Sequence, residues 1–179
     1  MPLSLHGQFR PGKWRRHVGN EILYVRDQGG DFVVAEGEVV LAAAKRHLSR
    51  RIRRGVKLSN PKLVRDFLAV TLGDRDCEYF CIILLDAQHR FLRFVELFRG
   101  TIDGASVHPR EVVKLVLEGQ SAAVVLVHNH PSQNVHFSSA DEQITQRLKG
   151  VLEMIDVRVL DHLLVAGGDV VSAAERGFI

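Results

Sequence analysis

Residues 79–85 read YFCIILL, an uninterrupted apolar run, and no other feature constrains the fold of this chain as strongly. A run of this length is typical of a β-strand, and its lack of alternation indicates that both faces of the strand are covered. A shorter run of the same kind, VVLV, stands at residues 124–127. Strands of this kind belong to sheets that carry helices on both faces, so we expect an α/β fold.

Strand and helix patterns alternate through the rest of this part of the chain. The predicted strands are 79–85, 90–97, 124–127, 157–166 and 170–172, and the predicted helices are 109–117 and 139–155. Residues 86–89 form a turn, which makes the second strand the hairpin partner of the first. Ser139 and Glu142 are expected to begin the longer helix as a capping box. The pattern predicts a mixed central sheet flanked by helices.

The first part of the chain is basic and less regular. Residues 1–38 are predicted to be a basic N-terminal extension with a short strand at Asp31–Ala35, and residues 39–179 to be the folded domain. Apolar residues at helical spacing predict a helix over 39–54, and Ser59-Asn60-Pro61 opens a second one.

Charge is divided unevenly along the chain. Residues 10–65 hold 14 Lys and Arg against 5 Asp and Glu, whereas residues 66–179 hold 10 against 16. Basic residues 45–54 therefore suit an anionic partner such as nucleic acid, and a solvated helix face is the alternative.

Composition excludes several classes of protein. No apolar run approaches the ~20 residues that a membrane helix needs, and the first residues lack the apolar stretch of a signal peptide. The two cysteines, Cys77 and Cys81, are not spaced like a metal-binding pair, and so few cysteines fit a reducing compartment. We expect a cytoplasmic protein with no membrane partner.

The residues that carry chemistry follow the VVLV strand. His128 and His130 are two apart, so on an extended chain both imidazoles point to one side. Asp141 falls in the first turn of the next predicted helix, where the positive helix end favours a carboxylate. Two imidazoles and one carboxylate are the three-ligand set of a catalytic zinc site, in which the fourth position is left for water. The sequence therefore predicts Zn²⁺ at His128, His130 and Asp141.

A zinc hydrolase also needs a general base and an oxyanion donor. Glu78 precedes the apolar strand 79–85, which is expected to lie beside strand 124–127, and partial burial would raise its pKa toward neutrality. The Ser138 hydroxyl is placed to donate a hydrogen bond to a developing oxyanion. These residues predict hydrolysis of an acyl bond by a zinc-bound water, without a covalent intermediate.

At these positions the chain resembles the JAMM (MPN+) metalloprotease family, whose motif is an upstream Glu followed by H-x-H-x7-S-x2-D. It is most similar to the RadC branch, on Glu78-Tyr79-Phe80 leading into ILLD and on ELFRGT (96–101), HPREV (108–112), HNHPS (128–132) and VLDHLLV (159–165). The similarity covers about residues 40–179. No helix-hairpin-helix segment like that of long RadC proteins is recognised, so the chain looks like the short, domain-only form.

This resemblance implies a cytidine-deaminase-like JAMM/MPN+ fold, a bound zinc ion and metallopeptidase activity on a peptide or protein substrate. It also implies that His128, His130 and Asp141 are the ligands, Glu78 the base and Ser138 the oxyanion donor; Glu96 is the alternative base. Two positions depart from the pattern of the family, since Gln133 stands where Gly is usual and Phe137 where Pro is usual. Both departures concern the shape of the loop rather than the ligands.

Other interpretations compete with this one. A deaminase would need H-x-E and P-C-x-x-C, which are absent, and the string HNH does not have the dispersed spacing of the nuclease motif. His108 and His162 are expected to fix local turns, and Asp161 to be a charge at the sheet edge or to orient a ligand. The alternative functions are a DNA-associated repair or recombination accessory protein with a vestigial zinc site, and a non-catalytic scaffold. The substrate and the oligomeric state are left open.

Overall fold

The computed structural model describes residues 22–100 and 107–179, so most of the predicted extension lies outside the described residues. The described residues divide into two units, and the boundary lies between Gly37 and Glu38. In the first unit, β1 (Tyr24–Arg26) pairs antiparallel with β2 (Phe32–Val34). The sequence predicted a strand close to β2 but missed β1, because a three-residue strand leaves almost no pattern.

The second unit is built around one five-stranded sheet. Its strands are β3 (Tyr79–Leu85), β4 (Phe91–Arg99), β5 (Ala123–Asn129), β6 (Arg158–Ala166) and β7 (Asp169–Ser172). They lie in the order β4-β3-β5-β6-β7, with β5 and β6 parallel and the other neighbours antiparallel. The predicted mixed sheet is confirmed.

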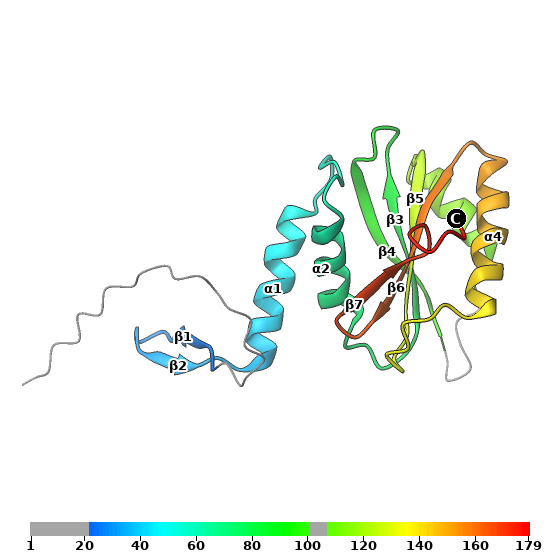
Figure 1. Cartoon of the computed structure of the whole chain (residues 1–179). Coiled ribbons are helices and arrows are strands. Elements are labelled where there is room, and N and C mark those ends of the chain that lie inside the picture. Colours follow the sequence, from blue (N-terminus) through cyan, green and yellow to red (C-terminus); the bar gives the residue numbers. More distant parts are fainter. Residues whose placement is uncertain (1–21, 101–106) are drawn as a thin grey trace, which may run out of the picture. The chain divides into compact units, whose positions relative to one another are not determined.

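Four helices accompany this sheet: α1 (Gly37–Arg51), α2 (Pro61–Leu72), α3 (Pro109–Glu118) and α4 (Ser139–Glu153). Side chains alternate along β3, so that Cys81, Ile83 and Leu85 pack with α2 on one face. Phe80, Ile82 and Leu84 pack with α3 and α4 on the other. Figure 1 shows α2 and α4 on opposite sides of the sheet. The apolar run YFCIILL is therefore covered on both faces, as predicted.

Helix α1 differs from its sequence-based expectation. The helix was predicted over 39–54 but ends at Arg51; α1 itself contains no buried residue, and the buried Ile52 comes just after its end. The predicted stripe consists of Leu41, Ala44, Leu48 and Ile52: the first three are half-buried, whereas Ile52 is buried in the core under α2 and Leu48 packs against that core. Among the described residues, no helix is long and apolar enough to span a membrane.

The start of α4 is a second correction. The capping residue is Ser138 rather than Ser139: the Asp141 N–H donates to Ser138 Oγ, and the Ser138 N–H donates to the Asp141 carboxylate. Both Ser138 and Ser139 have an acidic residue three positions later, so the local pattern fits either register. The observed register makes Asp141, not Glu142, the carboxylate of the capping box.

A glycine at the end of α2 is predicted to be essential for packing. A Cβ atom on Gly73 would lie closer than 3.0 Å to the carbonyl oxygen of Gly167, in the turn between β6 and β7. We expect Gly73→Ala to lower the free energy of unfolding by about 1–3 kcal/mol, because backbone must move to admit the methyl group. Gly150→Ala, in the exposed interior of α4 with nothing near the added atom, should raise it by about 0.5–1 kcal/mol. Chemical denaturation measures both, and equal effects of the two substitutions would contradict the close approach.

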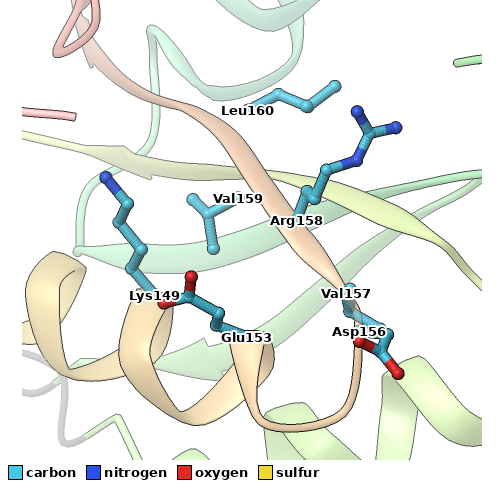
Figure 2. Close-up of a pocket in the computed structure, with 7 residues that line it drawn as sticks. All are labelled: Lys149, Glu153, Asp156, Val157, Arg158, Val159 and Leu160. Atoms are coloured by element: carbon cyan, nitrogen blue, oxygen red, sulfur yellow. The ribbon is translucent and has the colours of Figure 1, made fainter.

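The sheet and α4 also enclose a surface pocket of about 490 Å³ (Figure 2). It is lined by Lys149, Glu153, Asp156, Val157, Arg158, Val159 and Leu160, where α4 ends and β6 begins. Asp141 lies in the first turn of α4, twelve residues and about 18 Å along the helix from Glu153. The pocket is therefore separate from the predicted ligands.

Candidate metal centre

The strand β5 sets the direction of the first histidine. His128 pairs with Phe80 of β3, and directly opposed residues on neighbouring strands point to the same face. Phe80 belongs to the core under α3 and α4, so His128 faces α4. The strand is three residues longer than predicted: it begins one residue earlier, at Ala123, and includes His128 and Asn129.

The second histidine follows immediately after β5. The backbone N–H of His130 donates to the carbonyl of Val165 at 2.8 Å, which continues the contact with β6 one residue beyond the strand. The chain therefore stays extended through His130, and its imidazole lies on the same side as that of His128. Their ring centroids are 4.8 Å apart.

Asp141 reaches the two imidazoles from the first turn of α4. Its Oδ2 accepts hydrogen bonds from the Ser138 N–H at 2.7 Å and from the Ser138 hydroxyl at 2.6 Å. These contacts fix the orientation of the carboxylate. The capping box that starts the helix thus also aims the third candidate ligand.

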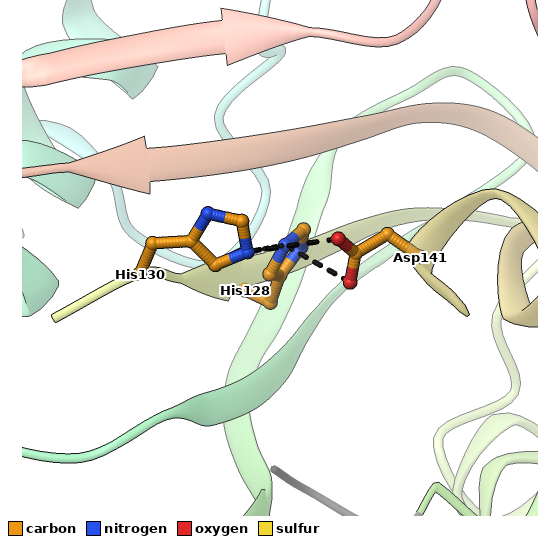
Figure 3. A group of neighbouring side chains, drawn as sticks. All are labelled: His128, His130 and Asp141. Carbon is orange, nitrogen blue, oxygen red and sulfur yellow. Dashed lines mark hydrogen bonds and ion pairs between the residues drawn. The ribbon is translucent and has the colours of Figure 1, made fainter. Parts of the chain in front are cut away.

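The three side chains meet with their donor atoms close together (Figure 3). The Nε2 atoms of His128 and His130 are 3.2 Å apart, and they lie 3.3 Å and 3.6 Å from the nearer oxygens of Asp141. A tetrahedral zinc ion with bonds of about 2.0–2.1 Å requires ligand atoms ~3.3 Å apart. The side chains are only 7%, 11% and 18% exposed. This group fits a small divalent metal ion in both donor chemistry and spacing.

The titration of this group reflects the close contacts within it. Burial by itself would raise the pKa of Asp141, but the close contacts of its carboxylate with the imidazoles of His128 and His130, and its hydrogen bond from Ser138, outweigh burial and hold that pKa well below its usual range. The Asp141 carboxylate in turn raises the pKa of His130, and Glu78 contributes in the same direction. Asp141 is therefore ionised at neutral pH, as a metal ligand must be.

A backbone carbonyl orients His130. Its Nδ1 lies 2.9 Å from the carbonyl oxygen of Asn134, which can only accept a hydrogen bond. The proton of the neutral ring is then on Nδ1, and the Nε2 lone pair points toward His128 and Asp141. Metal-binding histidines typically have a second partner of this kind.

Glu78 immediately precedes β3, and β3 pairs with the strand that carries His128. Asn129 holds the chain on both sides of it: its side chain accepts from the Tyr79 N–H at 2.8 Å and donates to the Cys77 carbonyl at 3.1 Å. Asn129 is almost completely buried, so these contacts are shielded from water. Its side chain links the backbone around Glu78 to the strand of His128.

Glu96, the alternative base, lies elsewhere. It pairs with Cys81, whose side chain belongs to the core under α2, whereas His128 pairs with Phe80 and faces α4. The Glu96 carboxylate also forms an ion pair with Arg75 at 2.9 Å. Glu96 therefore lies on the opposite face of the sheet from His128.

The two departures in the loop have structural consequences. Gln133 has a φ of +59°, in the left-handed region that favours glycine, so the backbone keeps a glycine-like conformation at some cost in strain. The Phe137 ring packs edge-on against the rings of His128 and His162, at centroid distances of 5.7 Å and 5.4 Å. An aromatic ring thus covers the imidazoles from the side of the loop.

Sequence reasoning missed two residues that contact this group. His162 was expected to fix a local turn, but it is fully buried in β6, and its Nε2 lies 2.8 Å from Nδ1 of His128. Burial, aided by the nearby His128, lowers the pKa of His162 well below its ordinary value. Thr145 is also fully buried and contacts His162. Thr145 lies four residues after Asp141 on a predicted helix, and this spacing could have indicated that the two residues are neighbours. The role of His162 could be found only from the pairing of β5 with β6.

Comparisons with known proteins identify the family to which this chain is related. Residues 58–178 match a family model described as the RadC-like JAB domain. A UPF0758 protein of Shewanella baltica (strain OS185) is 52% identical over 150 residues, which are 84% of this chain and 67% of that protein. A UPF0758 protein of Aeromonas hydrophila is 51% identical over 145 residues, which are 81% of this chain and 65% of that protein. The chain thus spans about two thirds of the length of these relatives, and their names state no activity.

Proposed function

Because this chain belongs to the RadC family, with a domain of the JAB type, we propose that it is a zinc-dependent hydrolase of peptide or isopeptide bonds. His128, His130 and Asp141 would hold the ion. The observation that carries the proposal is the spacing of their donor atoms: the two imidazole Nε2 atoms are 3.2 Å apart, and each lies 3.3–3.6 Å from one oxygen of the Asp141 carboxylate. In residues 22–100 and 107–179, no fourth His, Cys, Asp or Glu joins this group, which is the ligand count of catalytic rather than structural zinc sites.

A zinc ion in this position supplies a Lewis acid for the scissile carbonyl and lowers the pKa of a coordinated water. Glu78 is assigned the role of general base, because it is half-buried beside the His128 strand and near enough to His130 for its charge to act there. The proton that Glu78 takes from the attacking water would then pass to the leaving amine. The exposed Ser138 hydroxyl donates to Asp141 Oδ2 in this structure, and it is assigned to redirect that proton to the developing oxyanion while the Ser138 N–H keeps its hydrogen bond to the carboxylate.

Cleavage by the zinc-loaded protein tests this proposal. The protein is loaded with one equivalent of zinc and incubated with a mixed peptide library and with isopeptide-linked peptide pairs, and new amino termini are counted by mass spectrometry. We expect cleavage that a chelator abolishes and added zinc restores. Stoichiometric zinc without cleavage of either substrate type would favour the non-catalytic scaffold.

One observation favours a second candidate function, association with DNA. Arg46, Arg50, Arg51, Arg53 and Arg54 are all exposed, at α1 and just beyond it. Within the part of the chain that the structure describes, none of them forms an ion pair with a carboxylate. A cluster of unneutralised guanidinium groups suits phosphate contacts.

Salt dependence distinguishes this interaction from an inert basic surface. If the cluster binds duplex DNA, changing Arg50, Arg51, Arg53 and Arg54 to Gln should make the slope of log K against log[salt] shallower by up to about 3–4. The exposed Arg93 and Arg147 lie outside the cluster, and changing both to Gln should leave the slope unaltered. Equal slopes for the parent protein and the fourfold variant would show that this arginine cluster does not bind DNA.

The two cysteines support a proposal for the cellular compartment. Cys77 and Cys81 are both free thiols, and Cys81 is fully buried. A zinc hydrolase without a disulfide in its domain fits the reducing cytoplasm, which we propose as its location.

A further inference from the structure

A chain of buried polar contacts connects His128 to the helix that carries Asp141. His128 Nδ1 lies 2.8 Å from Nε2 of His162, and His162 Nδ1 lies 2.5 Å from Oγ1 of Thr145. Thr145 Oγ1 in turn lies 2.5 Å from the backbone carbonyl oxygen of Asp141. His162 and Thr145 are both 0% exposed, so no water competes for these contacts. This series of contacts therefore joins two candidate ligands, His128 and Asp141, through His162 and Thr145, which do not themselves touch the metal position.

The last hydrogen bond in this series, from Thr145 to the Asp141 carbonyl, fixes which atom donates in each of the others. The Asp141 carbonyl can only accept, and two oxygens 2.5 Å apart need a hydrogen between them, so the Thr145 hydroxyl donates to it. With its one proton used, Thr145 Oγ1 accepts from His162, which places a proton on His162 Nδ1.

The next link follows from the burial of His162. A fully buried imidazole with no carboxylate among its described contacts carries a single proton, since the charged form would be buried without an ionic partner. Its Nε2 is then an acceptor, and His128 must donate to it from Nδ1. The remaining nitrogen of His128, Nε2, is left with a lone pair that faces His130 and Asp141.

We infer that His162 and Thr145 are positioning residues which hold His128 in the tautomer with its proton on Nδ1, so that Nε2 is free to bind the metal. This inference rests on the metal site of the proposed function. His130 obtains the same tautomer from the Asn134 carbonyl in the loop, whereas His128 depends on two side chains from β6 and α4. The rings of Phe80 and Phe137 pack against His162 at 5.7 Å and 5.4 Å and hold it in place.

Zinc affinity, measured by competition with a chromophoric chelator, tests the role of each side chain. His162→Phe keeps a ring of similar size but removes the acceptor, and it should weaken zinc binding about 10–100-fold. His162→Gln keeps an acceptor for His128 and should restore most of the affinity. Thr145→Val should weaken binding and Thr145→Ser should not, because only the hydroxyl matters. His136→Gln changes an exposed histidine of the same loop and should leave the affinity unchanged.

The tautomer itself is measured by long-range ¹H–¹⁵N NMR correlations of the imidazole rings in the zinc-free protein. We expect His128 to carry its proton on Nδ1 in the parent protein and to become a tautomer mixture in Thr145→Val. A loss of affinity caused only by poorer packing would leave this spectrum unchanged, and melting temperatures identify any variant that is unfolded at the assay temperature.

The outcomes separate this inference from the proposed function. A protein that shows the Nδ1–H tautomer but binds no zinc contradicts the hydrolase and leaves the positioning of His128 established. Zinc binding that is equal in the parent protein, His162→Phe and Thr145→Val overturns the inference and leaves the hydrolase intact. A proton on Nε2 of His128 in the zinc-free parent protein overturns it as well.

Discussion

Replacing Glu78 by Gln is expected to lower kcat for peptide hydrolysis by about 10²–10⁴-fold, while the protein still binds one equivalent of zinc. The amide is close in size to the carboxylate but cannot take a proton. Glu78 is not a member of the His128, His130 and Asp141 group, so the metal affinity should change little. Steady-state kinetics and chelator competition on the same preparation measure the two quantities.

The matched control is Glu96→Gln. Glu96 forms an ion pair with Arg75 and faces the core under α2, away from His128, so this variant should lose only the small contribution of a half-exposed ion pair. A large loss of kcat in Glu96→Gln with little change in Glu78→Gln would show that the base has been assigned to the wrong residue.

The second large effect is expected for the ligands. His130→Ala should weaken zinc binding by about 10²–10³-fold, because the roughly 10–16 kcal/mol of a four-ligand zinc site is divided among its ligands. Its imidazole lies beyond β5 and outside both hydrophobic cores, so the zinc-free variant should remain folded. Isothermal titration with zinc and a thermal melt without it measure both effects.

His136→Ala is the control for this variant, since His136 belongs to the same loop but is exposed and is not a member of the ligand group. It should bind zinc as the parent protein does. Similar affinities for the parent protein and His130→Ala would mean that the ion is bound somewhere else.

The elements that sequence predicted best are those whose signal is local. YFCIILL predicted β3 to the residue, because the apolar run begins and ends where both faces of the strand become covered. The alternation of a strand also sufficed to bring His128 and His130 to one side. Both predictions used only neighbours along the chain.

Other features depended on information that the local sequence does not hold. The register of the α4 cap was ambiguous because Ser138 and Ser139 both precede an acidic residue at the right spacing. The apolar stripe of α1 is only partly covered, since Leu48 packs against the core but no residue of the helix is buried, and the local pattern does not reveal this. The contact of His162 with His128 requires the parallel pairing of β5 and β6, two strands joined through α4. Only the last of these cases depends on long-range strand pairing; in the first, two neighbouring residues fit the same local pattern.

Asp141 shows how one residue combines structural and chemical requirements. Its carboxylate completes the capping box with Ser138, its backbone carbonyl accepts from Thr145, and its oxygens face both imidazoles. The same helix start that stabilises α4 therefore delivers the third ligand to the edge of the sheet.

X-ray absorption at the zinc edge, on protein loaded with one equivalent of zinc, tests the metal centre most directly. We expect four nitrogen or oxygen neighbours at about 2.0–2.1 Å, with the outer-shell scattering of two imidazoles, as His128, His130, Asp141 and one water would give. A sulfur neighbour at about 2.3 Å, or an ion without imidazole scattering, would contradict the assignment and place the zinc outside this group.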